Sequence, residues 1–544
     1  MTVDILSSAV LDPVGPDARR PVIIAFMIII GLSLLWLFTL AAVEENTPEK
    51  LYLANRSLSP LFNGFAMAGE QISVVALFTL SGGIALFGYD GVIYAMDCLF
   101  GLAVLLLLAQ KMHNSGCYTL GDLFSMRASG TAPRIAATMV TLAVSMPLLI
   151  VQLRAAGISA AVLIGRPTDG VEVLCTVLIG CLIACFAAVA GLRGNSFLHV
   201  VKVPITVVTL AAVSLLAVRR FDWDPGSLLS AAVEKSVKPD GYLKPGLWPR
   251  VPHLGAVDLV GAHVVAVLGL ALVPHMILRI SASQSGQAAR RSLSIASGLI
   301  ALFVLLLITA GFAAAAVLGG ANILAVDASG EAAQIQLASS VLSDGSQGRV
   351  AIIVVVACVV FLAVLSTVTS ATFAAAVSCA HDVFASGKDR TEPEEMRALR
   401  VAAVVMGVVG LSAAAALHRY PTQFLASLSL NVAASCIFPV LIYSFFWRRF
   451  NRRGLLLSVH GGLSLCAILT ILSPTVSGTR MALFPDAHFN WYPFVSPGLV
   501  ALPATFFLGW LGSVTSRDDH ELDFRLVEYR LLTGKEPGRE SART

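Results

Sequence analysis

The sequence predicts an all-α integral membrane protein with about thirteen transmembrane helices. Of its 544 residues, 57% are hydrophobic and only 13% are charged, whereas soluble domains carry about 25% charged residues. The mean hydropathy is +0.82. Apolar runs of roughly 18 or more residues, each long enough to cross a bilayer, recur from end to end. No stretch outside these runs is long enough for a separate soluble domain.

The predicted spans follow one another along the whole chain. Two of them, 132–164 and 349–385, exceed one bilayer thickness, so we expect tilt, a break or an extension beyond the membrane, with Pro147 marking an irregularity in the first. The predicted spans are 22–43, 62–87, 92–111, 132–164, 171–190, 197–218, 256–280, 292–320, 349–385, 399–418, 423–447, 455–473 and 495–513.

Positive charges in the short loops predict the orientation in the membrane. The strongest marker is the RRFNRR segment at 448–453, which we expect on the cytoplasmic side. We expect the protein in a bacterial-type cytoplasmic (inner) membrane. An odd number of spans then places the N-terminus outside the cell and the tail at 516–544 in the cytoplasm. Arg19 and Arg20 precede the first span and acidic residues follow it, which for that helix alone favours the opposite orientation.

Composition and motifs argue against several classes of function. The net charge of +4 is small and dispersed, which argues against a nucleic-acid partner. The nine cysteines are scattered, without a CxxC or Cys/His metal spacing, and we expect them to be small buried hydrophobes. The spans contain no nucleophile–base pair, and the chain has no Gly-Lys-Ser/Thr phosphate loop. A membrane enzyme and ATP-driven transport are therefore both unsupported.

The segment Ala66–Gly82, AMAGEQISVVALFTLSG, interrupts the second span with polar residues and glycines. Glu70 and Gln71 lie near its middle, beside Gly69 and Ser73. An ionisable group at this depth costs several kcal/mol and is typical of a functional site rather than a lipid-facing helix. The segment therefore predicts a loosened helix that forms a site for a small solute or ion.

Motifs distributed along the chain carry a resemblance to a known family. They read LYLANRSLSPLFNG, LFGYDGVIYA, CYTLGDLFSMR, GLRGNSFLHVVK, VPHMILRI followed by QAARRS, AHDVF, CIFPVLIYSFFWRRFNRRG and FRLVEYRLLTG. Over residues 48–534, in unbroken order, the chain resembles the sodium:solute symporter family. GYDG and its surroundings are most similar to the cation/acetate branch, which carries acetate and related short monocarboxylates.

The resemblance implies a LeuT-like fold made of two inverted repeats of five helices each. The polar segment lies at the start of the first repeat, which agrees with a broken first core helix. The predicted segments are 1–61 (an extra transmembrane helix and the first inside loop), 62–218 (first repeat), 219–255 (outside loop), 256–447 (second repeat), 448–515 (two C-terminal transmembrane helices) and 516–544 (cytoplasmic tail).

The resemblance also implies a sodium site between the first and eighth core helices. Its oxygens would come from the carbonyls of Gly69 and Ile72 and from the eighth helix, where the family pattern falls on Ala363, Ser366 and Thr367. A hard cation needs several such oxygens, and an unwound helix exposes carbonyls that a regular helix does not. Alternatively, the two hydroxyl groups bond backbone and hold helices together. We expect Na+ as the coupling ion, with H+ second.

A short carboxylate needs hydrogen-bond donors or a positive charge, and an apolar wall for its other end. Gln71 and Ser73 qualify as donors, and Gln152 matches the family's glutamine. Two charged residues depart from the family: Arg154 stands where an apolar residue is usual, and Glu70-Gln71 replaces Asp-Tyr. Either Glu70 and Arg154 pair structurally, which we favour, or Arg154 binds the substrate while Glu70 balances it in the empty carrier.

Other residues in the spans bear on the site less directly. Leu270 and its neighbours make the apolar wall of the predicted solute site bulkier than in the acetate branch. This difference is compatible with a small organic acid other than acetate as the substrate. Lys202 is expected to snorkel toward the membrane surface. Asp97 is expected either to join a proton path or to pair with a nearby polar group. Asn431 is expected to contribute to the packing of helices. His381-Asp382 is expected to form a structural hydrogen bond.

The sequence thus predicts a secondary symporter that couples inward Na+ flow, or H+ flow, to uptake of a small monocarboxylate such as acetate, propionate or pyruvate by alternating access. The alternatives are the same fold carrying an amino acid, a polyol or urea, and a transporter-like sensor domain, although the tail is too short for a kinase. The expected partners are a small organic anion and the lipid bilayer. No nucleic acid and no obligate protein partner are expected.

Overall fold

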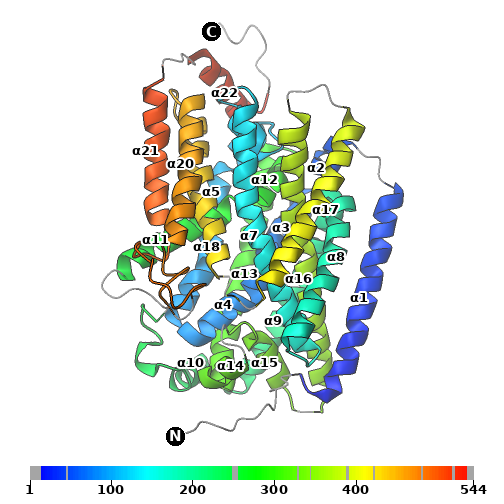
Figure 1. Cartoon of the computed structure of the whole chain (residues 1–544). Helices are drawn as coiled ribbons and strands as arrows, with labels where there is room; N and C mark the ends of the chain where they lie inside the picture. Colours follow the sequence, from blue (N-terminus) through cyan, green and yellow to red (C-terminus); the bar gives the residue numbers. More distant parts are fainter. Residues whose placement is uncertain are drawn as a thin grey trace.

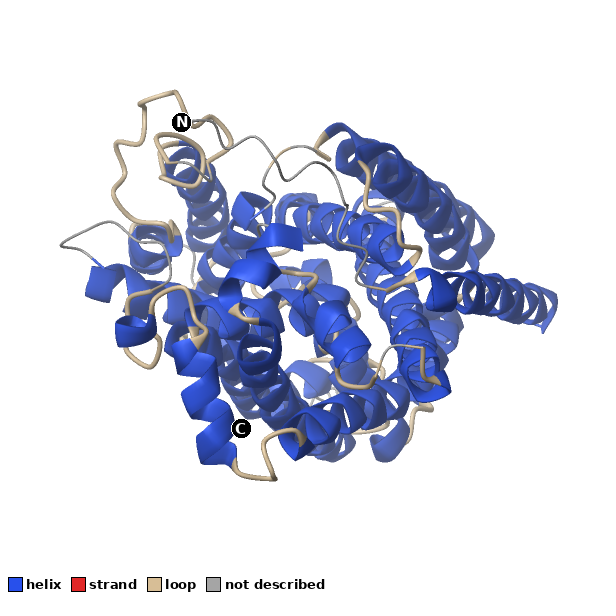
Figure 2. Ribbon diagram, turned by 90° about the horizontal axis from the view of Figure 1, so that it is seen from below, coloured by secondary structure: helices blue, strands red, loops and turns tan. Residues whose placement is uncertain are grey.

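The computed structural model describes residues 14–43, 47–247, 255–326, 330–343, 345–386, 391–418, 420, 423–479, 482–516 and 521–535. Within these ranges the chain forms helices and no β-sheet, which confirms the predicted all-α class. The long helices run side by side in one bundle (Figure 1). Figure 2 looks along the bundle and shows many of the same helices nearly end on, with loops joining them at that face.

By length and composition, ten continuous helices and two bent pairs in the described part of the chain can cross a bilayer. The last predicted span corresponds to the shorter apolar helix α21 (Gly498–Val514). The continuous spans are α1 (Pro16–Val43), α5 (Tyr89–Asn114), α7 (Thr131–Leu163), α8 (Asp169–Val189), α9 (Gly191–Arg219), α13 (Gly286–Leu318), α16 (Gln347–Val377) with η3 (Ser378–Ala385), α17 (Glu392–Ala416), α18 (Gln423–Val432) with η4 (Ala433–Ile437) and α19 (Phe438–Phe446), and α20 (Arg452–Ile471).

The first bent pair lies in the predicted polar segment and confirms that this helix is broken. Helix α3 (Pro60–Gln71) meets α4 (Val74–Phe87) at an angle of 54°. Ile72 leaves the helical region at φ −79° and ψ 74°, and the extended Ser73 then caps α4 by accepting a hydrogen bond from the Ala76 N–H. A serine N-cap satisfies a free donor at the start of the second half. The chain therefore restarts as a helix without leaving the bundle.

The second bent pair opens the second predicted repeat. Helix α11 (Gly255–Ala271) meets α12 (Pro274–Ser281) at 40°. Val273 is extended and precedes Pro274. Proline pushes the residue before it out of the helical region and is well placed at the first position of a new helix. Each predicted repeat thus starts with a broken helix, by different local chemistry in the two cases.

The two overlong spans differ from each other. Helix α7 runs for 33 residues without interruption, although Pro147 lies inside it. The other span, α16, continues through η3, a segment of π-helix with wider turns. The predicted irregularity at Pro147 therefore does not break the helix, whereas the end of the second span changes its winding.

Short helices occupy the segments expected to be loops. Helices α10 (Pro225–Glu234), α14 (Gly320–Val326) and α15 (Ala333–Ser340) gather at one end of the bundle, and α22 (Glu521–Thr533) lies at the opposite end (Figure 1). This arrangement agrees with the predicted placement of the long loops and the tail on opposite sides. The remaining short helices are α2 (Pro48–Leu53), η1 (Ala54–Arg56), α6 (Leu120–Ser125) and η2 (Pro239–Gly241).

The close approach of α4 to the backbone of Gly330 predicts how a substitution at Gly82 changes the stability of the protein. A Cβ added at Gly82 would lie 2.2 Å from the carbonyl oxygen of Gly330, whereas one added at Gly298 on α13 would meet nothing within 4 Å. Overpacking of this kind costs about 1–3 kcal/mol. We therefore expect Gly82→Ala to lower the melting temperature of the purified protein in detergent. The control Gly298→Ala should leave it unchanged or slightly higher, and equal melting temperatures for both variants would contradict the close packing.

Candidate functional site

A buried ion pair lies beside the two helix breaks. The Oε1 atom of Glu70, at the end of α3, accepts a hydrogen bond from Nε of Arg279 on α12 at 2.5 Å. The side chains of Arg279 and Glu70 are 0% and 1% exposed. Ser370 of α16 also donates to this oxygen at 2.5 Å, and Nε2 of His199 on α9 lies 3.3 Å from it. Residues of three other helices, α9, α12 and α16, therefore converge on one carboxylate oxygen of α3.

The surroundings of the pair satisfy most, but not all, of its polar atoms. Arg279 donates through Nη1 to the hydroxyl of Ser196 at 2.8 Å, and Asn195 donates to Ser370. Among the described residues, Oε2 of Glu70 and Nη2 of Arg279 are buried without a hydrogen-bond partner. The polar atoms of buried charged side chains normally all have hydrogen-bond partners. Each of the two charged groups thus keeps one position free for a further donor or acceptor.

The prediction that Glu70 pairs with Arg154 is wrong. Arg154 donates through both terminal nitrogens to the backbone carbonyls of His418 and Tyr420, each at 2.6 Å. These carbonyls directly follow the end of α17, where a positive charge also meets the negative end of the helix. Arg154 therefore acts as a helix cap. The partner of Glu70 is instead Arg279, which stands four residues after the proline-histidine motif.

Two of the predicted solute donors, Gln71 and Ser73, lie at the first break. Gln71 donates through Nε2 to the carbonyl of Leu270 at 3.4 Å and so links the first break to the second. The hydroxyl of Ser73 is used as the cap of α4. Gln152 lies on α7, which packs against α4, and its buried Oε1 has no partner among the described residues. Gln152 is thus the member of the set whose polar group is least satisfied by the protein.

The predicted cation ligands come from two helices that pack against each other, α3 and α16. Ser366 donates to the carbonyl of Leu362 at 2.7 Å, and Thr367 donates to that of Ala363 at 2.6 Å. The alternative role of these hydroxyls, bonding backbone, is therefore observed. It does not remove their second function, since a hydroxyl that donates its hydrogen keeps lone pairs for a cation.

The carbonyl of Gly69 already has a partner. Lys202 of α9 donates to it through Nζ at 2.7 Å, and the whole side chain is fully buried. The expectation that Lys202 snorkels to the surface is wrong, because its hydrogen bond leads into the bundle. A Cβ added at Gly69 would lie 2.6 Å from the ring of His199, so glycine is what lets α3 approach α9 this closely.

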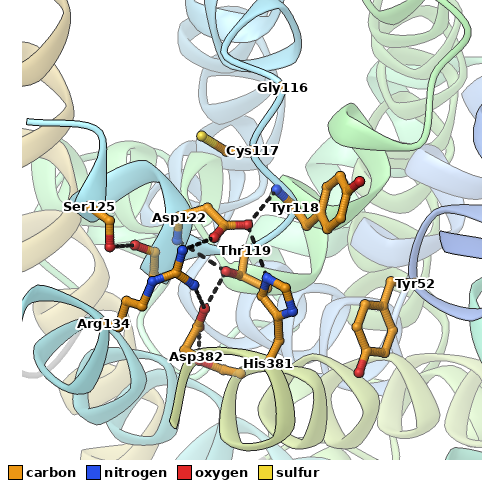
Figure 3. A network of polar contacts seen from close by, with 12 residues as sticks. Tyr52, Gly116, Cys117, Tyr118, Thr119, Asp122, Ser125, Arg134, His381 and Asp382 are labelled. Carbon is orange, nitrogen blue, oxygen red and sulfur yellow. Dashed lines mark hydrogen bonds and ion pairs between the residues drawn. The ribbon is translucent and has the colours of Figure 1, made fainter. Parts of the chain in front are cut away.

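A second polar network lies at the end of α16 (Figure 3). Asp382 accepts hydrogen bonds from Thr119 at 2.5 Å and from Ser378 at 2.7 Å. Asp122 of α6 pairs with Arg134 of α7 at 2.7 Å, and His381 lies between Asp122 at 3.4 Å and a glutamate of α17 at 2.9 Å. The expected structural bonding of His381 and Asp382 is confirmed. With Arg134 between the two aspartates, the network consists of ion pairs and hydrogen bonds that tie α6, α7, α16 and α17 together.

The charge balance of this network favours ionised Asp122. Burial raises the pKa of its carboxyl, but the hydrogen bond and charge of His381, followed by the charge of Arg134, lower it more, so that the pKa lies at about 2. Asp122 therefore stays negative at all physiological pH values and keeps its hold on both neighbours.

Other polar residues have found local partners. Nδ1 of His263 lies 2.8 Å from a carboxylate oxygen of Asp97, so the local polar partner of Asp97 is a histidine. Asn431 accepts hydrogen bonds from the backbone of Gly498 and from Ser496, and thereby joins α18 to the start of α21. Its predicted role in helix packing is confirmed.

The sequence profile of the "Sodium:solute symporter family" matches residues 51–462, more than half of the chain. The protein belongs to this family. The resemblance carried by its motifs is thereby confirmed, and the family consists of transporters rather than enzymes. The long apolar helices agree with an integral membrane protein.

Two curated relatives and one solved structure are similar over nearly the whole chain. A protein of Corynebacterium glutamicum named monocarboxylic acid transporter is 29% identical, over 98% of this chain and 98% of the relative. The uncharacterised symporter YwcA of Bacillus subtilis is 29% identical, over 94% and 97%. A Na+-coupled sialic acid symporter, in a substrate-bound outward-open state, superposes with a TM-score of 0.69 at 13% identity, over 91% of this chain and 98% of that one. The last likeness shows the LeuT-like fold.

The buried pair predicts a characteristic pattern of stabilities. Removing one partner of a buried ion pair costs about 3–5 kcal/mol, because the other charge stays buried without compensation. We expect Glu70→Gln to lower the melting temperature strongly, and the double variant Glu70→Gln/Arg279→Gln to recover part of the loss. The measurement is the thermal unfolding of the four combinations, arranged as a double-mutant cycle.

Arg154→Gln serves as the control for this cycle. It removes an arginine of the same bundle whose partners are backbone carbonyls at the end of α17, and it leaves no buried carboxylate behind. Its melting temperature should fall less than that of Glu70→Gln. Strictly additive losses in the cycle, or a larger loss for Arg154→Gln, would refute the assignment of the pair.

Proposed function

We propose that this protein couples inward Na+ flow to the uptake of a small monocarboxylate, such as acetate, propionate or pyruvate, by alternating access. The observation that carries the proposal is the buried Arg279, whose Nη2 has no partner among the described residues, in a cluster that joins the two broken helices. A guanidinium with a free N–H is well suited to a carboxylate. The similarity to the Corynebacterium glutamicum transporter over the full chain supports the same class of solute.

The solute site would lie at the two breaks. Gln71 lies at the first break and Gln152 lies on α7, which packs against α4. Each side chain carries an amide group with both donors and an acceptor. Ile72 and Leu272 are fully buried beside the breaks and supply apolar surface. Apolar surface beside these polar groups suits a short aliphatic chain attached to a carboxylate. Arg154 takes no part in this proposal, because both its terminal nitrogens are bonded to backbone.

The cation would lie between α3 and α16. Its ligands would be the carbonyls of Gly69, Ile72 and Ala363 and the hydroxyls of Ser366 and Thr367. The donor set consists of neutral oxygens, which suits a monovalent hard cation. Membership in the sodium:solute symporter family supports Na+ as that cation.

An amino acid is the second candidate solute. The free Oε2 of Glu70 lies in the same cluster as the free Nη2 of Arg279, so the cluster offers an acceptor for an ammonium group as well as a donor for a carboxylate. Uptake of a zwitterion in preference to a simple acid would favour this candidate.

Uptake into proteoliposomes tests the proposal. Radiolabelled acetate, propionate, pyruvate, proline and urea are supplied under an inward Na+ gradient or an inward H+ gradient, each with choline as the balancing cation. We expect a monocarboxylate to accumulate under the Na+ gradient. Accumulation of proline or urea alone would overturn the solute class, and equal uptake without Na+ would overturn the coupling ion.

A variant of Gln152 links the uptake to the proposed site. A hydrogen bond to a charged group contributes about 1.5–3 kcal/mol, so Gln152→Leu should raise KM roughly ten- to hundredfold. Gln347→Leu, at the exposed first residue of α16, is the matched control and should transport as the unaltered protein does. An unchanged KM in Gln152→Leu would remove this residue from the solute site.

A further inference from the structure

Lys202 places its Nζ atom where the first core helix is expected to bind Na+. Its Nζ donates to the carbonyl of Gly69 at 2.7 Å, and its side chain is fully buried. An ammonium group has three N–H donors and no acceptor. Among the described residues, that carbonyl is its hydrogen-bond acceptor. The lysine is therefore directed at one oxygen of the proposed cation site.

The register of α9 against α16 places Lys202 at the level of the proposed hydroxyl ligands. Nε2 of His199 lies 3.2 Å from the hydroxyl of Ser370. Further along α9, Thr206 lines a small cavity together with Val359, which precedes Ser370 on α16. The two helices thus run in opposite directions. Lys202 falls between these two contacts, opposite the part of α16 that carries Ser366 and Thr367.

The charges around Lys202 leave no surplus anion for another cation. Glu70 and Arg279 are the charged groups that act on it from α3 and α12, and these two already form a pair. His199 on its own helix and His275 on α12 complete the titratable groups facing the cluster among the described residues. A sodium ion on Gly69 would be a third cation beside one carboxylate. Like charges this close in a buried site repel strongly.

We propose that Lys202 is a tethered cation that competes with Na+ for the carbonyl of Gly69. In the conformation of this structure the ammonium group holds that oxygen, and Na+ binds it only after Nζ withdraws. Lys202 thereby sets the sodium affinity of the carrier, by occupying the site rather than by lining it. This inference rests on the proposed location of the cation site.

Direct binding of sodium tests the inference without any solute. Radioactive 22Na+ binding to the purified full-length protein in lipid nanodiscs is measured at one fixed pH, with choline as the replacement cation, for the unaltered protein, Lys202→Met and Lys202→Arg. Lys202→Met removes the charge and keeps a chain of similar length, and we expect it to bind Na+ about tenfold more tightly or better. Lys202→Arg keeps the charge and should bind as weakly as the unaltered protein. Equal or weaker binding in Lys202→Met overturns the proposal.

A second variant keeps the test decisive. Thr367→Val added to Lys202→Met should abolish the gained affinity, and persistence of the gain would show that the ion binds elsewhere, which also overturns the proposal. If Lys202→Met does not purify as a monodisperse protein, Lys202→Gln is used and Na+-dependent thermal stabilisation is the readout. Because no solute is present, failure of monocarboxylate uptake would leave this result standing. The proposed solute class and the role of Lys202 can therefore fail separately.

Discussion

The ion pair between Glu70 and Arg279 is the interaction on which the centre of this protein depends. It joins α3, which precedes the first break, to α12, which follows the second. The two side chains are 0–1% exposed. A buried pair of this kind adds little net stability over an apolar contact, but separating its members is costly. Its main effect is therefore on geometry: the two half-helices hold one relative position as long as the pair persists.

The two breaks give the pair its setting. At Ile72 and Val273 the chain leaves the helical conformation for one or two residues and then resumes it. Backbone groups freed at such points are tolerated in a bilayer only where they are buried in protein or line a polar cavity. The side chain of Gln71 donates a hydrogen bond to the carbonyl of Leu270 across the two breaks, and so a side chain at the first break satisfies a backbone carbonyl near the second. Beside the breaks, Oε2 of Glu70 and Nη2 of Arg279 remain without a hydrogen-bond partner among the described residues.

Hydropathy and local chemistry predicted the fold class, nearly all the spans and the first break, because each of these depends on residues close together in the chain. The partners of the charged residues could not be predicted in this way. Glu70 bonds Arg279, 209 residues away, and Arg154 bonds carbonyls 264 and 266 residues away. Periodicity tells which face of a helix a side chain occupies, but not which other helix lies opposite. The inward direction of Lys202 was missed for the same reason, since snorkelling is a rule about one helix and its distance from the surface.

Helix α16 and its continuation η3 carry the proposed ion ligands and part of the second polar network on one continuous helix. Ser366 and Thr367 lie on its regular part, and Asp382 follows four turns later on the wider π-helical end, where it is bonded to Thr119. A tilt of this helix as one unit away from α3 would also strain the contacts of Asp382 with Thr119 and Arg134. The proposed ion ligands and the second polar network thus share one structural element.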